Sequence, residues 1–279
     1  HGIVYDVDMA PQLDDVIKVV FTFYGPPATR VHATSVRPPI IQLRQPINLS
    51  RFSPQGPISE RPRRAVAISN YLVGKRRQIL IDACREAGIE LELFGVNESR
   101  STLAPEHEIN SADIVFGKAR VTAEAMACGR AAYVYDAFGC DGWVTPENLE
   151  PLVATGLNVS ATTYTADAER LAADLASYDP AMGQVNRDLA MATFSANRHI
   201  AQLAEGLERI VPSTPAHNDS AFELARMSRT SWGFESELHV LRHQMTIVNH
   251  RAEQLEAQRA ELSRQLGLIT ESSRWKLLN

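Results

Sequence analysis

Residues 113–136 read Asp-Ile-Val-Phe-Gly-Lys-Ala-Arg-Val-Thr-Ala-Glu-Ala-Met-Ala-Cys-Gly-Arg-Ala-Ala-Tyr-Val-Tyr-Asp. Their apolar opening, Asp113–Gly117, predicts a strand that is buried on both faces of a sheet. The next segment predicts a helix from about Val121 to Cys128, which Gly129 ends. Ala131–Tyr135 predicts another strand. Strands that alternate with helices at this spacing are typical of a parallel α/β sheet.

The same alternation extends toward the N-terminus. Ala65–Ile68 predicts a strand, Lys75–Ala87 a helix and Ile89–Phe94 the next strand. We therefore expect an α/β fold with a doubly wound, Rossmann-like parallel sheet. Ligands bind such sheets beyond the carboxyl ends of the strands. Those ends fall here after Ile68, Phe94, Phe116 and Tyr135.

The flanking segments predict a division into three parts. Residues 1–54 are expected to form a partial N-terminal lobe and linker, residues 55–211 the main domain, and residues 212–279 a linker and a C-terminal helix. The N-terminal part contains three strand-like runs, Lys18–Phe23, Arg30–Ser35 and Ile40–Leu43, and a proline-containing linker, Pro46–Pro57. Helices are expected at Ala166–Ser177 and Gly183–Ile210, with a break at Val211–Pro215. Because the sequence opens with His1 inside a strand-like run, we expect a fragment of a longer protein.

Beyond that break, apolar residues recur at alternating spacings of three and four. Only Arg259 interrupts the register, which predicts a coiled coil and self-association through residues 238–269. A single amphipathic helix docked on the main domain is the alternative. The seam consists of Leu238, Leu241, Met245, Val248, Ala252, Leu255, Leu262, Leu266 and Ile269.

Composition narrows the class of protein. The 279 residues carry a formal net charge of −5, which argues against a general nucleic-acid binder. The cysteines Cys84, Cys128 and Cys140 show neither metal spacing nor a disulfide framework, so reduced thiols are expected. No apolar run approaches a membrane span, and no signal peptide is visible. We expect a cytoplasmic protein, soluble or peripheral on the inner membrane; the short cationic tail at Ser272–Lys276 would suit contact with a membrane surface.

The turn after the strand that ends at Gly117 suits a diphosphate. A helix N-terminus supplies unpaired N–H groups and a positive dipole end, and small residues permit close approach of the backbone. Lys118 and Arg120 add charge beside the turn, although simple solvation of both cations is the alternative. Glu124, one turn into the helix, is then either a solvent-facing residue or an acceptor for ribose hydroxyls.

These residues resemble a known family. The run Glu124–Ala131 after an Ala-Asp-Ile-Val-Phe-Gly strand is similar to the donor domain of GT-B glycosyltransferases of the group 1, retaining type. The likeness continues through Tyr133–Asp136 and Gly139–Glu147. Gln45–Pro54 resembles the interdomain linker of these enzymes. In all, the resemblance covers about residues 18–208.

The resemblance implies a donor site, residue by residue. Glu124 would bind the donor ribose, and the turn Gly117, Lys118, Ala119, Arg120 and Val121 would hold the diphosphate. Asn70, Lys75 and Arg76, after the first strand, would correspond to the phosphate-contacting segment. Gly139 and Asp141 belong to a flexible polar loop that would face the sugar, unless that loop is only a tight turn. No catalytic residue is assigned.

Two departures from the family pattern limit the implied activity. Many members carry a first glutamate eight positions before the second, and Phe116 stands there in this chain. Only about sixty residues precede the donor domain, fewer than an acceptor lobe needs. Closure of that lobe would neutralise the leaving diphosphate in a water-poor site. The fragment alone is therefore expected to be a weak enzyme or inactive.

The leading hypothesis is a metal-independent glycosyltransferase of bacterial cell-surface polysaccharide synthesis. It would use a nucleotide-diphosphate sugar and a glycan or lipid-linked acceptor, without a cofactor. A nucleotide-sugar epimerase of the GT-B type is one alternative, with Asp136 and Asp141 as its acid–base candidates. A degenerate, non-catalytic donor domain that serves as a coiled-coil assembly module is the other. Asp6 and Asp8, or His239 and His243, are weak candidates for a metal.

Overall fold

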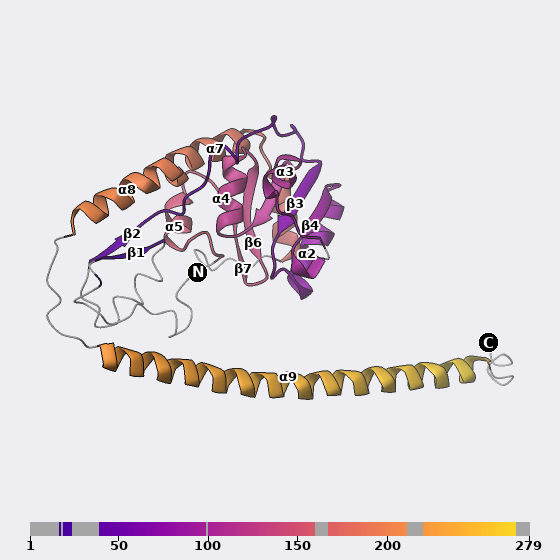
Figure 1. Cartoon of the computed structure of the whole chain (residues 1–279). Coiled ribbons are helices and arrows are strands. Elements are labelled where there is room, and N and C mark those ends of the chain that lie inside the picture. The colour runs from indigo at the N-terminus through magenta and orange to yellow at the C-terminus, as the bar shows by residue number, and fades with distance from the viewer. Residues whose placement is uncertain are drawn as a thin grey trace. The chain divides into compact units, whose positions relative to one another are not determined.

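The computed structural model of the chain describes residues 17, 19–23, 39–98, 100–159, 167–210 and 220–271. The described residues up to 210 belong to one compact unit and those from 220 to another. Each unit is described by itself (Figure 1).

A five-stranded sheet in the order β4-β3-β5-β6-β7 forms the centre of the first unit. The first four strands are parallel: β3 (Arg64–Ile68), β4 (Glu90–Phe94), β5 (Ile114–Gly117) and β6 (Ala131–Asp136). At one edge, β7 (Gly139–Trp143) pairs with β6 in the antiparallel direction. The sheet confirms the predicted α/β fold class and the predicted strands of the main domain.

Helices cover both faces of this sheet, as a doubly wound sheet requires. On one face, α2 (Gly74–Glu86) and α6 (Ala168–Ala176) contribute Leu80 and Leu171 to a buried cluster with Phe116. The other face is covered by α3 (Pro105–Asn110), α4 (Arg120–Ala127), α5 (Leu149–Ala154) and α7 (Ala181–Phe194). The helices on this other face build a second buried cluster with the sheet. Successive strand residues alternate between the two clusters: Val115 belongs to this second cluster, whereas Phe116 belongs to the first, under α2 and α6.

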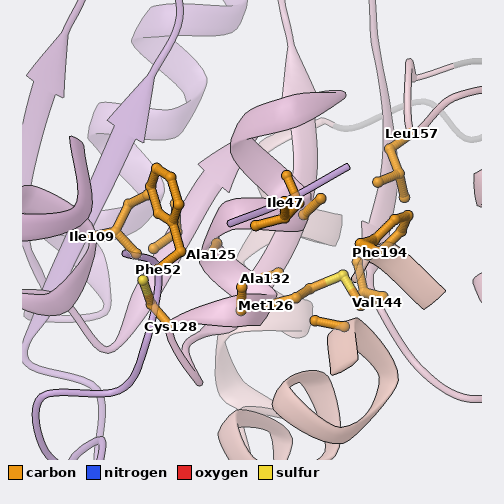
Figure 2. Packing of buried hydrophobic residues seen from close by; sticks show 14 of the residues in the cluster. Ile47, Phe52, Ile109, Ala125, Met126, Cys128, Ala132, Val144, Leu157 and Phe194 are labelled. Carbon is orange, nitrogen blue, oxygen red and sulfur yellow. The ribbon is translucent and has the colours of Figure 1, made fainter. Parts of the chain in front are cut away.

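The segment predicted as a linker is part of the second cluster. Ile47 and Phe52 have at most 1% of their surface exposed and belong to the same buried cluster as Met126, Ala132 and Phe194. Figure 2 shows the ring of Phe52 beside Ile109. Ile47 also forms a backbone bridge with Ser195 and so joins the linker to the end of α7. This segment is therefore fixed against the sheet rather than acting as a free connection.

One predicted helix is divided in two at the residue that forms this bridge. The expected helix over Gly183–Ile210 is two helices, α7 and α8 (Ala196–Glu208), because Ser195 has an extended ψ of 126°. Its backbone pairs with Ile47 instead of continuing the helix. The helical spacing of apolar residues continues from α7 into α8, so the sequence pattern does not reveal the break at Ser195.

Several short elements differ from the prediction. The prediction of a flexible loop at residues 139–142 is wrong, because these residues belong to the buried strand β7. α3, α5 and a 3-10 helix, η2 (Val96–Glu98), are unpredicted. Near the N-terminus, β1 (Val20–Thr22) and β2 (Ile40–Gln42) form a separate parallel pair, shorter than the two predicted strands. The expected strand at 30–35 and the break at 211–215 lie outside the described residues.

The second unit contains one long helix, α9 (Ser220–Glu271), of 52 residues. It covers the predicted heptad seam without interruption. None of the helices in the described ranges combines the length and the apolar character that crossing a membrane requires.

Replacement of Phe52 by alanine tests the attachment of the linker. Removing a fully buried aromatic side chain is expected to lower the free energy of unfolding by about 3–5 kcal/mol. Urea denaturation measures this change. Phe138→Ala is the matched control: its ring is 71% exposed, so we expect a loss of about 1 kcal/mol or less. Similar losses in both variants would contradict the described packing of residues 45–54.

Candidate functional site

The turn between β5 and α4 has a tightly constrained backbone. A Cβ on Gly117 would lie 2.5 Å from Val121 Cγ1, so any other residue there would have to displace the Val121 side chain. Ala119, the N-cap of α4, has a φ of 49°, a conformation that is uncommon outside glycine. Its N–H donates to the carbonyl of Leu157 at 2.7 Å. Strained backbone of this kind clusters at ligand sites, which makes the turn a candidate.

The first turn of α4 lies at the carboxyl edge of the parallel strands. Its N-cap residue, Ala119, makes no side-chain cap hydrogen bond. Thr122 is 1% exposed, and its hydroxyl has no hydrogen-bond partner among the described residues. The beginning of α4 therefore keeps the polar character of an open helix end, where an anion is favoured.

Glu124 is buried, which excludes the solvent-facing alternative. Only 4% of the residue is exposed, and the alanines on either side of it are also buried. Arg120 Nε donates to Glu124 Oε1 at 2.6 Å across one helical turn. Burial raises the pKa of the Glu124 carboxyl, and the opposing effect of the Arg120 guanidinium is smaller. Arg51 and Glu106 also act on this carboxyl electrostatically, so it belongs to a small ionic cluster.

Lys118 is held in an ion pair, and 20% of its side chain is exposed. Its Nζ lies 2.7 Å from Asp136 Oδ2, an ion pair without the alignment of a hydrogen bond. Asp136 ends β6 and has no exposed surface. The rings of Tyr71 and Phe138 lie on Lys118, each with its centroid 4.7 Å from Nζ. The cation expected to serve a phosphate is thus neutralised within the fold.

The remaining predicted residues occupy different places around this edge. Asn70 Oδ1 accepts from Val96 N at 3.2 Å, which joins the ends of β3 and β4. Lys75 is exposed in the first turn of α2. Arg76 accepts a hydrogen bond at its carbonyl from Tyr135, while its buried Nη1 has no partner among the described residues.

Gly139 and Asp141 lie on β7 and not on a mobile loop. A Cβ on Gly139 would lie 2.6 Å from the carbonyl oxygen of Val159, so the backbone of Val159 packs directly on the strand. Asp141 is 6% exposed. Together with Asp136, it was a candidate for acid–base chemistry; both side chains are buried within the described fold.

Sequence reasoning missed Ser69, Tyr71 and Phe138. Ser69 Oγ donates to Asp136 Oδ1 at 2.8 Å and accepts the N–H of Tyr71. The available signal was an aromatic residue two or three positions after each of two strand ends, together with a lysine directly after a third strand. That these residues lie close together follows only from the strand order, which places β3, β5 and β6 next to one another.

Other features lie away from this edge. Cavities of about 560 and 540 Å³ are lined by residues such as Arg61 and Tyr178 in the first and Gly129 and Arg187 in the second. Among the described residues, no three His, Cys, Asp or Glu side chains gather as metal ligands. Residues 6 and 8 and the side chains at positions 239 and 243 lie outside the described part of the chain.

Comparison with known proteins gives only a remote likeness. No family model and no curated protein matches the sequence. The chain resembles two crystal structures of TarM, one of an S. aureus TarM mutant in complex with fondaparinux, α-GlcNAc-glycerol and UDP. Both have 12% identity and a TM-score of 0.43, and the match covers 70% of this chain. The chain spans 45% and 44% of those two chains, and a likeness this remote says nothing about activity.

A double-mutant cycle tests the ion pair between Lys118 and Asp136. Lys118→Met leaves a buried carboxylate without its cation and is expected to cost about 3–5 kcal/mol of stability. The pair Lys118→Met with Asp136→Asn removes both charges and should lose clearly less. Urea denaturation of the single and double variants gives the coupling energy. Additive losses would show that the two side chains do not interact.

The raised pKa of Glu124 predicts a dependence of stability on pH. The folded state holds the proton more tightly than the unfolded state, so ionisation destabilises the fold as pH rises from the unfolded value, about 4.3, through the folded one. Glu124→Gln should therefore melt at a higher temperature than the parent at pH 7, and the difference should vanish near pH 4.

Glu106→Gln is the control with the opposite sign. The hydrogen bond from Arg51 lowers the pKa of the Glu106 carboxyl, so its ionisation favours the folded state at pH 7. This variant should melt at a lower temperature at pH 7 and approach the parent as pH falls below 4. Thermal unfolding followed by circular dichroism measures both, and shifts of the same sign would refute the electrostatic assignment.

Proposed function

We propose that the first unit binds a nucleotide-diphosphate sugar and is the donor half of a glycosyltransferase. The observation that carries the proposal is Glu124, a buried carboxylate one turn into a helix that begins at the carboxyl edge of a parallel sheet. Parallel sheets bind ligands at this edge. A buried carboxylate with a raised pKa in such a place is a candidate for function rather than for stability.

The diphosphate would lie at the N-terminus of α4. Gly117 lacks a side chain that would block the approach, and Ala119 presents only a methyl group there. The helix end supplies N–H donors and a positive dipole end, as in other anion sites at helix N-termini. The Thr122 hydroxyl, which has no hydrogen-bond partner within the described part of the chain, is a further polar group on this first turn.

The ribose would then bind at Glu124. Vicinal hydroxyls are suitable donors to an ionised carboxylate, and such charge-assisted bonds are strong where water is excluded. Arg120 now supplies a donor to Oε1, and its side chain is 57% exposed, so it can turn toward a phosphate when hydroxyls replace it. Arg120 and the exposed Lys75 are therefore the proposed phosphate cations.

Lys118 receives a different role. Contact with a phosphate would require it to leave Asp136, which would then be buried without a counterion. We assign Lys118 to fixing the turn, with its backbone and not its ammonium group facing the donor. The burial of Asp136 also disfavours the epimerase alternative, since a general acid or base must reach its substrate.

The activity of the whole enzyme is part of the proposal. The transferred sugar would pass to a glycan or lipid-linked acceptor, by a retaining, metal-independent route in bacterial polysaccharide synthesis. The TarM complex contains UDP, and by analogy a UDP-sugar is the first donor to test. An acceptor lobe is needed for catalysis, so binding is the appropriate measurement for this chain.

Calorimetric titration with UDP and with GDP tests the donor site. We expect one of the two to bind, and Glu124→Ala to weaken that binding about ten- to a hundred-fold, since it removes a hydrogen-bonded charge. Arg120→Ala should also weaken binding and reduce its salt dependence. Circular dichroism establishes that each variant is folded.

Glu169→Ala is the matched control, because Glu169 is an exposed glutamate on α6. It should bind nucleotide as the parent does. The absence of binding by both nucleotides, or equal affinity in the Glu124 and Glu169 variants, would reject the proposed donor site.

A further inference from the structure

The helix α9 presents a long apolar stripe that no described residue of its own unit covers. Six side chains of the heptad seam, Leu241, Met245, Val248, Leu255, Leu262 and Leu266, are each more than half exposed. The stripe contains two positions in seven, which is narrower than the face of a helix that packs on a globular body. It extends over residues 238–269, about 48 Å at the usual helical rise.

We propose that α9 pairs with α9 of a second copy of this chain as a parallel, in-register, two-stranded coiled coil. The register assigns Leu238, Met245, Ala252, Arg259 and Leu266 to a, and Leu241, Val248, Leu255, Leu262 and Ile269 to d. Leucine at most d positions is compatible with two strands. The seam meets itself over its whole length only when the two copies are aligned without an offset or fully reversed.

Charge distinguishes these two alignments. Arg251 occupies a g position and Glu256 the e position five residues later; both are exposed. In a parallel, in-register pair, g of one helix lies beside the following e of the other, so two Arg251–Glu256 pairs form across the interface. In the reversed alignment, g edges face g edges, and Arg251 would not meet Glu256.

Arg259 is compatible with the same arrangement. It is the one charged residue at an a position between 238 and 269. In the parallel pair it lies beside Arg259 of the partner, and both long side chains can extend from the seam into water. Reversal would place it against Val248. A polar residue at one a position sets register and strand number at a cost in stability, and that cost is smallest where the residue reaches solvent.

Cysteine cross-linking of the full chain tests the proposal. The a positions of a parallel dimer are close enough for a disulfide, so Ala252→Cys should form a covalent dimer under mild oxidation. Ala257→Cys, at the outward f position of the same helix, is the matched control and should stay uncrosslinked. The native cysteines are buried and do not compete. Light scattering of the parent should give twice the mass of one chain.

Two further variants separate dimer formation from orientation. Leu255→Glu should halve the measured mass, whereas Ala257→Glu should leave it unchanged. A monomeric parent, or equal cross-linking at 252 and 257, would overturn the proposal. A dimer in which Ala252→Cys cross-links only to Leu255→Cys in a mixture would show the reversed alignment and would also overturn it.

Discussion

The carboxylate of Asp136 is buried at the point where three parallel strands end. Ser69 after β3, Lys118 after β5 and the backbone N–H of Ala137 after β6 all contact it. A buried charge without these partners would destabilise the fold by several kcal/mol, so the three strand ends are held together. The strained turn at Ala119 follows directly on the paired lysine, and its N–H donates to the carbonyl of Leu157.

The opposite end of the sheet is organised by a matching pair of charges. Asp113 accepts hydrogen bonds from the backbone N–H groups of Ser59, Arg63 and Arg64, just before β5 begins. Arg130, just before β6, donates to the carbonyls of Ala112, Cys128 and Gly56. Both side chains are buried, and each is satisfied by backbone groups. The segment before β3 is thereby fixed against the amino edge, while the carboxyl edge is left for the candidate site.

Glu124 differs from these residues because its burial is only partly compensated. A raised pKa means that the fold would be more stable with a neutral side chain there. Residues that lower the stability of the fold are expected at functional positions, where a bound ligand supplies the missing interactions. The proposed ribose hydroxyls would do this, and they would also release Arg120 toward the diphosphate. Stability and ligand binding are thus expected to respond to Glu124 in opposite directions.

The sequence by itself determined the parallel strands, the turn at Gly117 and the heptad stripe of α9, because these depend on the local period of apolar residues and on glycine. It also singled out Glu124, a charge within an apolar helix. Only the tertiary structure decided that Ser195 breaks a helix, that residues 139–143 form a strand and that Lys118 is paired with Asp136. Each of these results from contacts between segments far apart in the chain, with Ile47, with β6 and across three strand ends. No local pattern encodes such contacts, since burial and strand order decide which polar groups meet.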